Sequence, residues 1–202
     1  MLKEILISNL NVVFVDAVVA EASDDLGFHH LGAKDKFWEM LEYSGIAGGA
    51  VVSKLDRKAL NDAKHTGVLN DIYKQFFFEK KESVLLKSRI GLTDLNRRVV
   101  VRVEDDPGAQ PTPDDVGHFV KKVEKFRPKV AAFVMNPEMF EKCFKPRYPA
   151  ATRERGKQEF RIGESEVWLL GSMSVRPKDA DAVEQLFDDL AERLSAIAGD
   201  NK

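Results

Sequence analysis

Two acidic residues, Asp16 and Glu21, occupy positions where a carboxylate could act in catalysis. Asp16 directly follows the apolar run of residues 11–15, and Glu21 lies five residues further on. A positioned carboxylate can take a proton from water and so activate it for attack. Asp16 could equally cap a turn or a helix, because aspartate commonly bonds to the backbone at such places. The residues alone leave both interpretations open.

A second group of polar residues, Ser174, Arg176 and Lys178, carries the hydroxyl and cationic donors that bind phosphate. The same segment could be an ordinary turn from a strand into a helix. Basic residues also outnumber acidic ones between positions 142 and 161. This segment could be a solvated loop or the flank of a phosphate-binding groove. Its basic residues are Lys142, Lys145, Arg147, Arg153, Arg155, Lys157 and Arg161.

Several classes of site are not indicated. The sequence has no glycine-rich phosphate loop and no Gly-x-Ser-x-Gly motif. Its four histidines lack the i,i+4 spacing of a helical metal site, and Cys143 is its single cysteine, so neither metal nor cofactor is expected. No apolar run reaches the roughly 18 residues that span a membrane. We therefore expect a cytoplasmic protein with no membrane partner.

Strands and helices are expected to alternate along the 202-residue chain. Short apolar runs predict strands, and apolar residues at helical spacing predict helices. The expected strands cover residues 11–15, 90–95, 99–103, 129–135 and 167–170. The expected helices cover residues 36–43, two segments within 56–89, 113–126, 137–144 and 180–197. This alternation predicts an α/β fold, a three-layer α/β/α sandwich around a mainly parallel sheet.

Ligands of such sheets bind in the crevice beyond the carboxyl ends of the strands. Three segments should meet there: residues 16–23, 93–98 and 171–178. The candidate acids and the candidate phosphate-binding residues therefore belong to the same end of the predicted sheet.

Three fragments in order carry a family resemblance. Residues 27–38 read Gly-Phe-His-His-Leu-Gly-Ala-Lys-Asp-Lys-Phe-Trp, and residues 90–95 read Ile-Gly-Leu-Thr-Asp-Leu. The third fragment has Gly-Lys-Gln at 156–158, Ile-Gly at 162–163 and Val-Trp-Leu-Leu at 167–170. Together they resemble the mismatch-specific uracil/thymine branch of the uracil-DNA glycosylase superfamily. The resemblance implies one domain over residues 1–202, with a helical insertion at about 64–87.

The resemblance also implies a function and assigns residues to it. It implies excision of a deaminated or damaged base from DNA by base flipping and metal-free hydrolysis of the N-glycosidic bond. The water-positioning asparagine of the family falls at Val18, and Asp16 takes the place of the first motif glycine. His30 falls where a ring stacks on the flipped base. Ser172 replaces the asparagine of the second motif.

The first motif thus departs from the family, because an apolar Val18 cannot orient water. Asp16 or Glu21 would have to replace the lost group, with Val18, His30 and Ser172 around the base. Ser174, Arg176 and Lys178 would grip DNA phosphate. The alternative is a catalytically silent protein of the same fold that binds DNA or a nucleotide. A different hydrolase built on the same crevice is a third possibility.

Overall fold

The structure, a computed structural model, describes residues 3–20, 23–24, 29–30, 36–47, 84–101, 110–173 and 179–199. Contacts divide the chain into two compact units. The first comprises Met1–His29 and Ile90–Met173, and the second His30–Arg89 and Ser174–Lys202. The prediction of a single domain stays a prediction.

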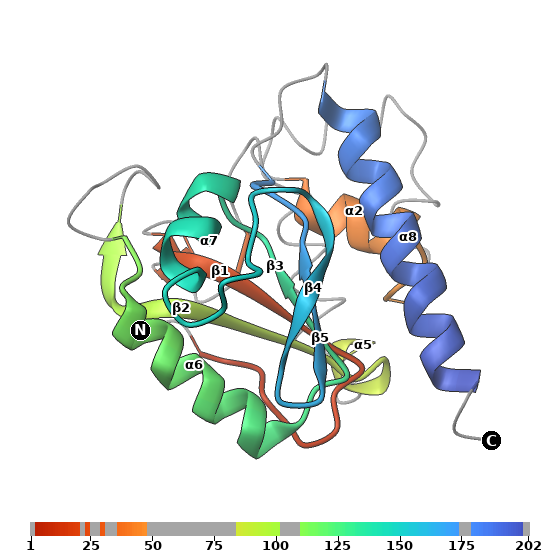
Figure 1. Ribbon diagram of the computed structural model, residues 1–202. Helices are drawn as coiled ribbons and strands as arrows, with labels where there is room; N and C mark the ends of the chain where they lie inside the picture. The colour runs from red at the N-terminus through yellow and green to blue at the C-terminus, as the bar shows by residue number, and fades with distance from the viewer. Residues whose placement is uncertain are drawn as a thin grey trace. The chain divides into compact units, whose positions relative to one another are not determined.

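The first unit is built on a five-stranded sheet in the order β2-β1-β3-β5-β4 (Figure 1). Strands β1 (Val12–Ala20), β2 (Ile90–Val101), β3 (Val130–Phe133) and β5 (Ser165–Leu169) are parallel to their neighbours in this order. Strand β4 (Gly156–Ile162) pairs antiparallel with β5. The predicted α/β class and mainly parallel sheet are confirmed, and the predicted strands at 11–15 and 167–170 lie in one sheet.

Helices α6 (Pro113–Phe126) and α7 (Pro137–Phe144) begin where the sequence predicts, and both starts have a local cause. The Thr112 side chain and Asp115 form a reciprocal capping box at α6. The Asn136 side chain accepts from two backbone amides of α7. Proline follows each cap and supplies a preset φ at the first helical position. These helices pack on one face of the sheet.

The core of the first unit lies between that face and the two helices. Alternation along β1 directs Val13 and Val15 toward it, together with Phe133 of β3. The helices contribute buried Phe119, Val120, Phe140 and Phe144. A third layer on the opposite face stays a prediction.

Three strand predictions need correction. β1 does not end at Asp16 but continues to Ala20, because β-branched Val18 and Val19 pair onward with β2. Residues 90–101 form one strand instead of two pieces. The segment 156–162 is a strand that the sequence did not predict, since its exposed charged residues hide the alternation.

The second unit contains α2 (Phe37–Tyr43), α5 (Val84–Lys87) and α8 (Ala180–Gly199). Phe37 and Phe187 meet edge to face at 6.3 Å between ring centroids, so α2 and α8 pack together. Phe37 and Trp38 are buried, as predicted for core residues. Of the predicted insertion at 64–87, only α5 is described. No described helix is long and apolar enough to cross a membrane.

Cys143 lies in the core of the first unit on α7 and is expected to be chemically inert. Burial raises the pKa of its thiol to about 11, and the thiol donates to the Pro111 carbonyl oxygen at 3.1 Å. The reactive thiolate is therefore scarce at neutral pH. Folded protein should react with a thiol reagent much more slowly than the same protein in guanidinium chloride. Equal rates would contradict the buried position.

Candidate active site

Asp16 and Asp94 are neighbours across two parallel strands. They are directly paired in the register of β1 and β2, so both side chains leave the sheet on the same face. That face is opposite to α6 and α7, because Val15 and Leu95, the adjacent residues, belong to the core under those helices. β3 stops pairing with β1 at Val15. Asp16 therefore stands just beyond the carboxyl end of β3, inside β1, which continues to Ala20 beside β2.

His29 completes a group of three polar side chains. One ligand-type atom each of Asp16, His29 and Asp94 lies within 4.8 Å of the other two. His29 and Asp94 are both 2% exposed, whereas Asp16 is partly buried. The His29 Nε2 atom lies 3.3 Å from the Lys3 carbonyl oxygen, which can only accept, so Nε2 carries the proton. We call this group the Asp-His-Asp cluster.

A further carboxylate, Glu4, lies near Asp94 and pairs with two cations. Arg97 lies 3.9 Å from Asp94 and 3.1 Å from Glu4, measured between nitrogen and oxygen. Lys122 of α6 and the Thr93 hydroxyl also bond to Glu4. Burial alone would raise the pKa of Glu4, but these bonds and the charges of Lys122 and Arg97 outweigh it and lower the pKa below 4.5. Glu4 is thus ionised and holds the two cations.

Glu4→Gln should lower the free energy of unfolding by about 1 to 3 kcal/mol at neutral pH, because it removes a partly buried charged partner. The Glu4 pKa is lower in the folded chain than in the unfolded one. Its stabilising contribution is therefore present above pH 4.5 and declines as the pH falls through the folded value. Urea unfolding of both proteins across this range measures the difference. The control is Glu138→Gln, whose side chain is 81% exposed, and an equal effect of both changes would contradict the role of Glu4.

The structure places three of the other predicted site residues. Val18 is buried at 7% exposure on the same sheet face as Asp16, directly paired with Asn96 of β2. Ser172 is partly buried and follows β5, which β3 separates from β1. His30 belongs to the second unit, where its ring stacks on Phe37 at 3.8 Å between centroids.

Four predicted residues lie outside the described residues. They are Glu21, Ser174, Arg176 and Lys178.

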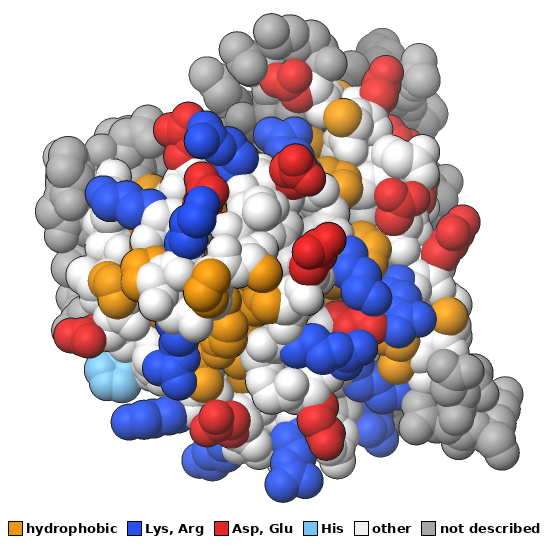
Figure 2. Space-filling view, viewed as in Figure 1, with side chains coloured by type: hydrophobic (Ala, Val, Ile, Leu, Met, Phe, Trp, Pro, Cys, Tyr) orange, Lys and Arg blue, Asp and Glu red, His pale blue; other side chains and the backbone are white. Residues whose placement is uncertain are grey.

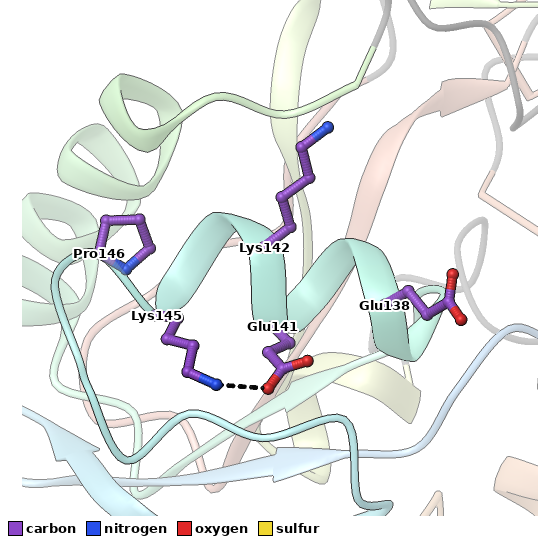
Figure 3. Close-up of a pocket in the computed structure, with 5 residues that line it drawn as sticks. All are labelled: Glu138, Glu141, Lys142, Lys145 and Pro146. Atoms are coloured by element: carbon purple, nitrogen blue, oxygen red, sulfur yellow. Dashed lines mark hydrogen bonds and ion pairs between the residues drawn. The ribbon is translucent and has the colours of Figure 1, made fainter.

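Several cations of the basic segment 142–161 form ion pairs with acidic side chains. Lys145 and Arg153 pair with Glu141 at 2.8 and 3.5 Å, and Figure 3 shows the Lys145 pair on α7. Lys157 and Arg161 both reach Glu166 at 3.2 Å. Blue and red side chains are interspersed on the face in Figure 2. The segment is an ion-pair network in which a phosphate ligand would compete with carboxylates.

The shallow depression in Figure 3 does not make a second site. Side chains of α7 and the residues just after it line it, with Lys142 directed away from the Lys145–Glu141 pair. The lining residues are Glu138, Glu141, Lys142, Lys145 and Pro146. None of these lining residues offers a buried polar side chain for a ligand, so the Asp-His-Asp cluster is the stronger candidate.

Sequence reasoning identified Asp16 but missed His29 and Asp94, and it indicated no cluster of metal-ligating side chains. One signal was present: Asp94 is a charged residue inside a predicted strand, within a segment expected to meet residues 16–23. Asp16 and Asp94 do pair, but inside β1 and β2 instead of beyond the strand ends, and residues 174–178 of the third segment lie outside the described residues. His29 offered no signal of its own, because only the fold brings it to the strands.

No family model matches the chain. The glycosylase resemblance accordingly depends on the three sequence fragments alone and leads to a proposal.

Proposed function

We propose that the protein is a DNA glycosylase-type hydrolase that excises a deaminated or damaged base, with Asp16 as the water-activating carboxylate. The observation that supports this most is the place of Asp16. It lies beside Asp94 and His29, just beyond the end of β3, where ligands of parallel sheets bind. The proposed partner is DNA, and the proposed location is the cytoplasm.

The proposed reaction is hydrolysis. Asp16 takes a proton from water as the water oxygen forms a bond to the anomeric carbon of the sugar. The bond from that carbon to the base nitrogen breaks, and the base leaves with the electron pair and takes a proton from solvent, while Asp16 returns to solvent the proton it accepted. Positive charge develops on the sugar, and the carboxylates of Asp16 and Asp94 would stabilise it.

Asn96 supports the same site. The family positions its water with an asparagine at the place of Val18, and Asn96 is the residue that pairs with Val18 across β1 and β2. Asn96 is 4% exposed and lies two positions after Asp94, hence on the same face of the strand. The neighbouring strand would thus supply an amide at the level where the resemblance expects one on β1.

Ser174, Arg176 and Lys178 are proposed to contact phosphate, with the cations of segment 142–161 beside them. Contacts of this kind release condensed counterions, so affinity should fall steeply as salt rises. Binding of an oligonucleotide at several salt concentrations measures the slope. Binding that does not depend on salt, or its absence at low salt, would contradict a DNA partner.

The alternative is a silent protein that binds DNA or a nucleotide. Two observations favour it: Val18 is apolar and buried, and one face of the His30 ring is covered by Phe37. The discriminating experiment is single-turnover release of uracil or hypoxanthine from oligonucleotides, single- and double-stranded. We expect an abasic product from at least one lesion. Binding with no product from every lesion would establish the alternative.

A further inference from the structure

We infer that Asp16, His29 and Asp94 form a binding site for one divalent transition-metal ion, with Zn²⁺ the best fit. The inference concerns binding of the ion and does not require the proposed glycosylase activity. Four observations support it: the spacing of the three ligand-type atoms, the carbonyl partner of His29, the balance of nearby charges, and the donor types.

The spacing fits one ion. Carboxylate oxygens and imidazole nitrogens bind Zn²⁺ at about 2.0 to 2.2 Å, so two ligands of the same ion lie no more than about 4.4 Å apart. The three groups already lie within 4.8 Å of one another. Closure by at most about 0.4 Å therefore brings every pair within range, which side-chain rotations can supply.

The hydrogen bond of His29 is the one that a metal-binding histidine needs. Such a histidine almost always donates its second ring N–H to a carboxylate or a backbone carbonyl. His29 Nε2 has the Lys3 carbonyl oxygen at 3.3 Å, which selects the tautomer with the proton on Nε2. Nδ1 is then the nitrogen that would bind the ion. The bond to Lys3 also orients the ring.

The local charge favours a cation. Two carboxylates side by side repel each other in a partly buried place unless positive charge lies between them. Arg97 is 0.8 Å closer to Glu4 than to Asp94, at 3.1 against 3.9 Å. Arg97 thus lies closer to Glu4 than to Asp94, and the cluster itself brings two carboxylates against one imidazole.

The donor types select the ion. Imidazole suits Zn²⁺, whereas Mg²⁺ prefers oxygen ligands alone, and sites with nitrogen and oxygen donors bind Mn²⁺ more weakly than Zn²⁺. Three protein ligands leave a position for water, as in catalytic zinc sites. A carboxylate that binds through one oxygen keeps its second oxygen as a proton acceptor. Asp16 could therefore serve both the ion and the proposed reaction.

The test is calorimetric titration of the full chain, freed of metal by a chelator, with Zn²⁺, Mn²⁺ and Mg²⁺. We expect one Zn²⁺ per chain, weaker Mn²⁺ and no measurable Mg²⁺. Asp94→Asn and His29→Gln should each weaken Zn²⁺ by at least about 100-fold, since even outer-shell partners account for 10- to 100-fold. The matched controls are Asp114→Asn and His118→Gln, both exposed on α6, and these should bind as the wild type does.

Absence of Zn²⁺ binding by the wild type would overturn the inference, and so would equal binding by the cluster variants and the controls. If a cluster variant fails to fold, binding of Zn²⁺ by the wild type still tests the inference. Zn²⁺ should raise its melting temperature, because an ion that binds only the folded state stabilises it. Mn²⁺ should also broaden the His29 ring signals in NMR spectra while those of His118 stay sharp. Sharp His29 signals at a Mn²⁺ concentration that saturates the chain in the calorimetric titration would overturn the site.

Base release with and without chelator separates this inference from the proposed function. One Zn²⁺ bound with no base release would overturn the glycosylase proposal and leave the metal site standing. Base release by a protein that binds no Zn²⁺, unchanged by chelator, would overturn the metal site and leave the glycosylase proposal standing.

Discussion

Asp16→Asn is expected to lower the rate of base release by about two to four orders of magnitude, the usual effect of removing a general base. The amide matches the carboxylate in size and can hydrogen-bond, but it does not take a proton from water. Affinity for DNA and the fold should be nearly unchanged, because Asp16 is only partly buried and lies outside the packed core. Single-turnover kinetics measures the rate constant directly.

Asp114→Asn is the matched control, since it makes the same chemical change at an exposed position of α6. Its rate should equal that of the wild type. An active enzyme indifferent to Asp16→Asn would contradict the proposed role and direct attention to Glu21 and His30. A loss of rate with a matching loss of melting temperature would instead assign Asp16 to stability.

Phe133→Ala should lower the free energy of unfolding by about 3 to 5 kcal/mol, the range for truncating a buried phenylalanine. Phe133 is fully buried in the central strand β3. Its ring lies 5.4 Å from Phe119, 5.1 Å from Phe140 and 4.8 Å from Phe144, between centroids. Truncation would leave a cavity among three rings held by two helices, which cannot readily collapse.

Urea unfolding measures this loss, and Phe133→Leu provides a graded comparison that keeps most of the apolar volume. The leucine variant should lose clearly less stability than the alanine variant. Equal losses would indicate that ring contacts dominate over cavity volume. A loss below about 1 kcal/mol for alanine would contradict the central position of Phe133 in the core.

Local sequence signals account for the part of the fold that could be predicted. The bounds of helices α6 and α7 were predicted accurately, because capping residues, proline and apolar spacing agree at their starts. The length of β1 was underestimated because its last residues pair only with β2, and such pairing depends on a distant segment. Strand β4 was missed because only Gln158 and Ile162 of its side chains are buried.

The candidate site was predictable to a smaller extent. Asp16 was found because it follows an apolar run that predicts a buried strand. Its pairing with Asp94 is a matter of register between strands more than 70 residues apart in sequence, which a single sequence does not specify. His29 lies close to them in the fold, where its ring bonds to the Lys3 carbonyl oxygen. A local sequence pattern does not reveal contacts of this kind between distant segments.

The charged edge strand β4 has a consequence for aggregation between copies of the protein. A sheet edge exposes unpaired backbone groups that can add a strand from a second chain, and charged side chains discourage this. On β4, Lys157, Glu159 and Arg161 are exposed and alternate in sign along the edge. At the opposite edge, Ile5 bonds to Leu92 and occupies part of β2. Both edges of the described sheet are thus protected against edge-to-edge aggregation, β4 by its charged side chains and β2 by its backbone bonds to Ile5.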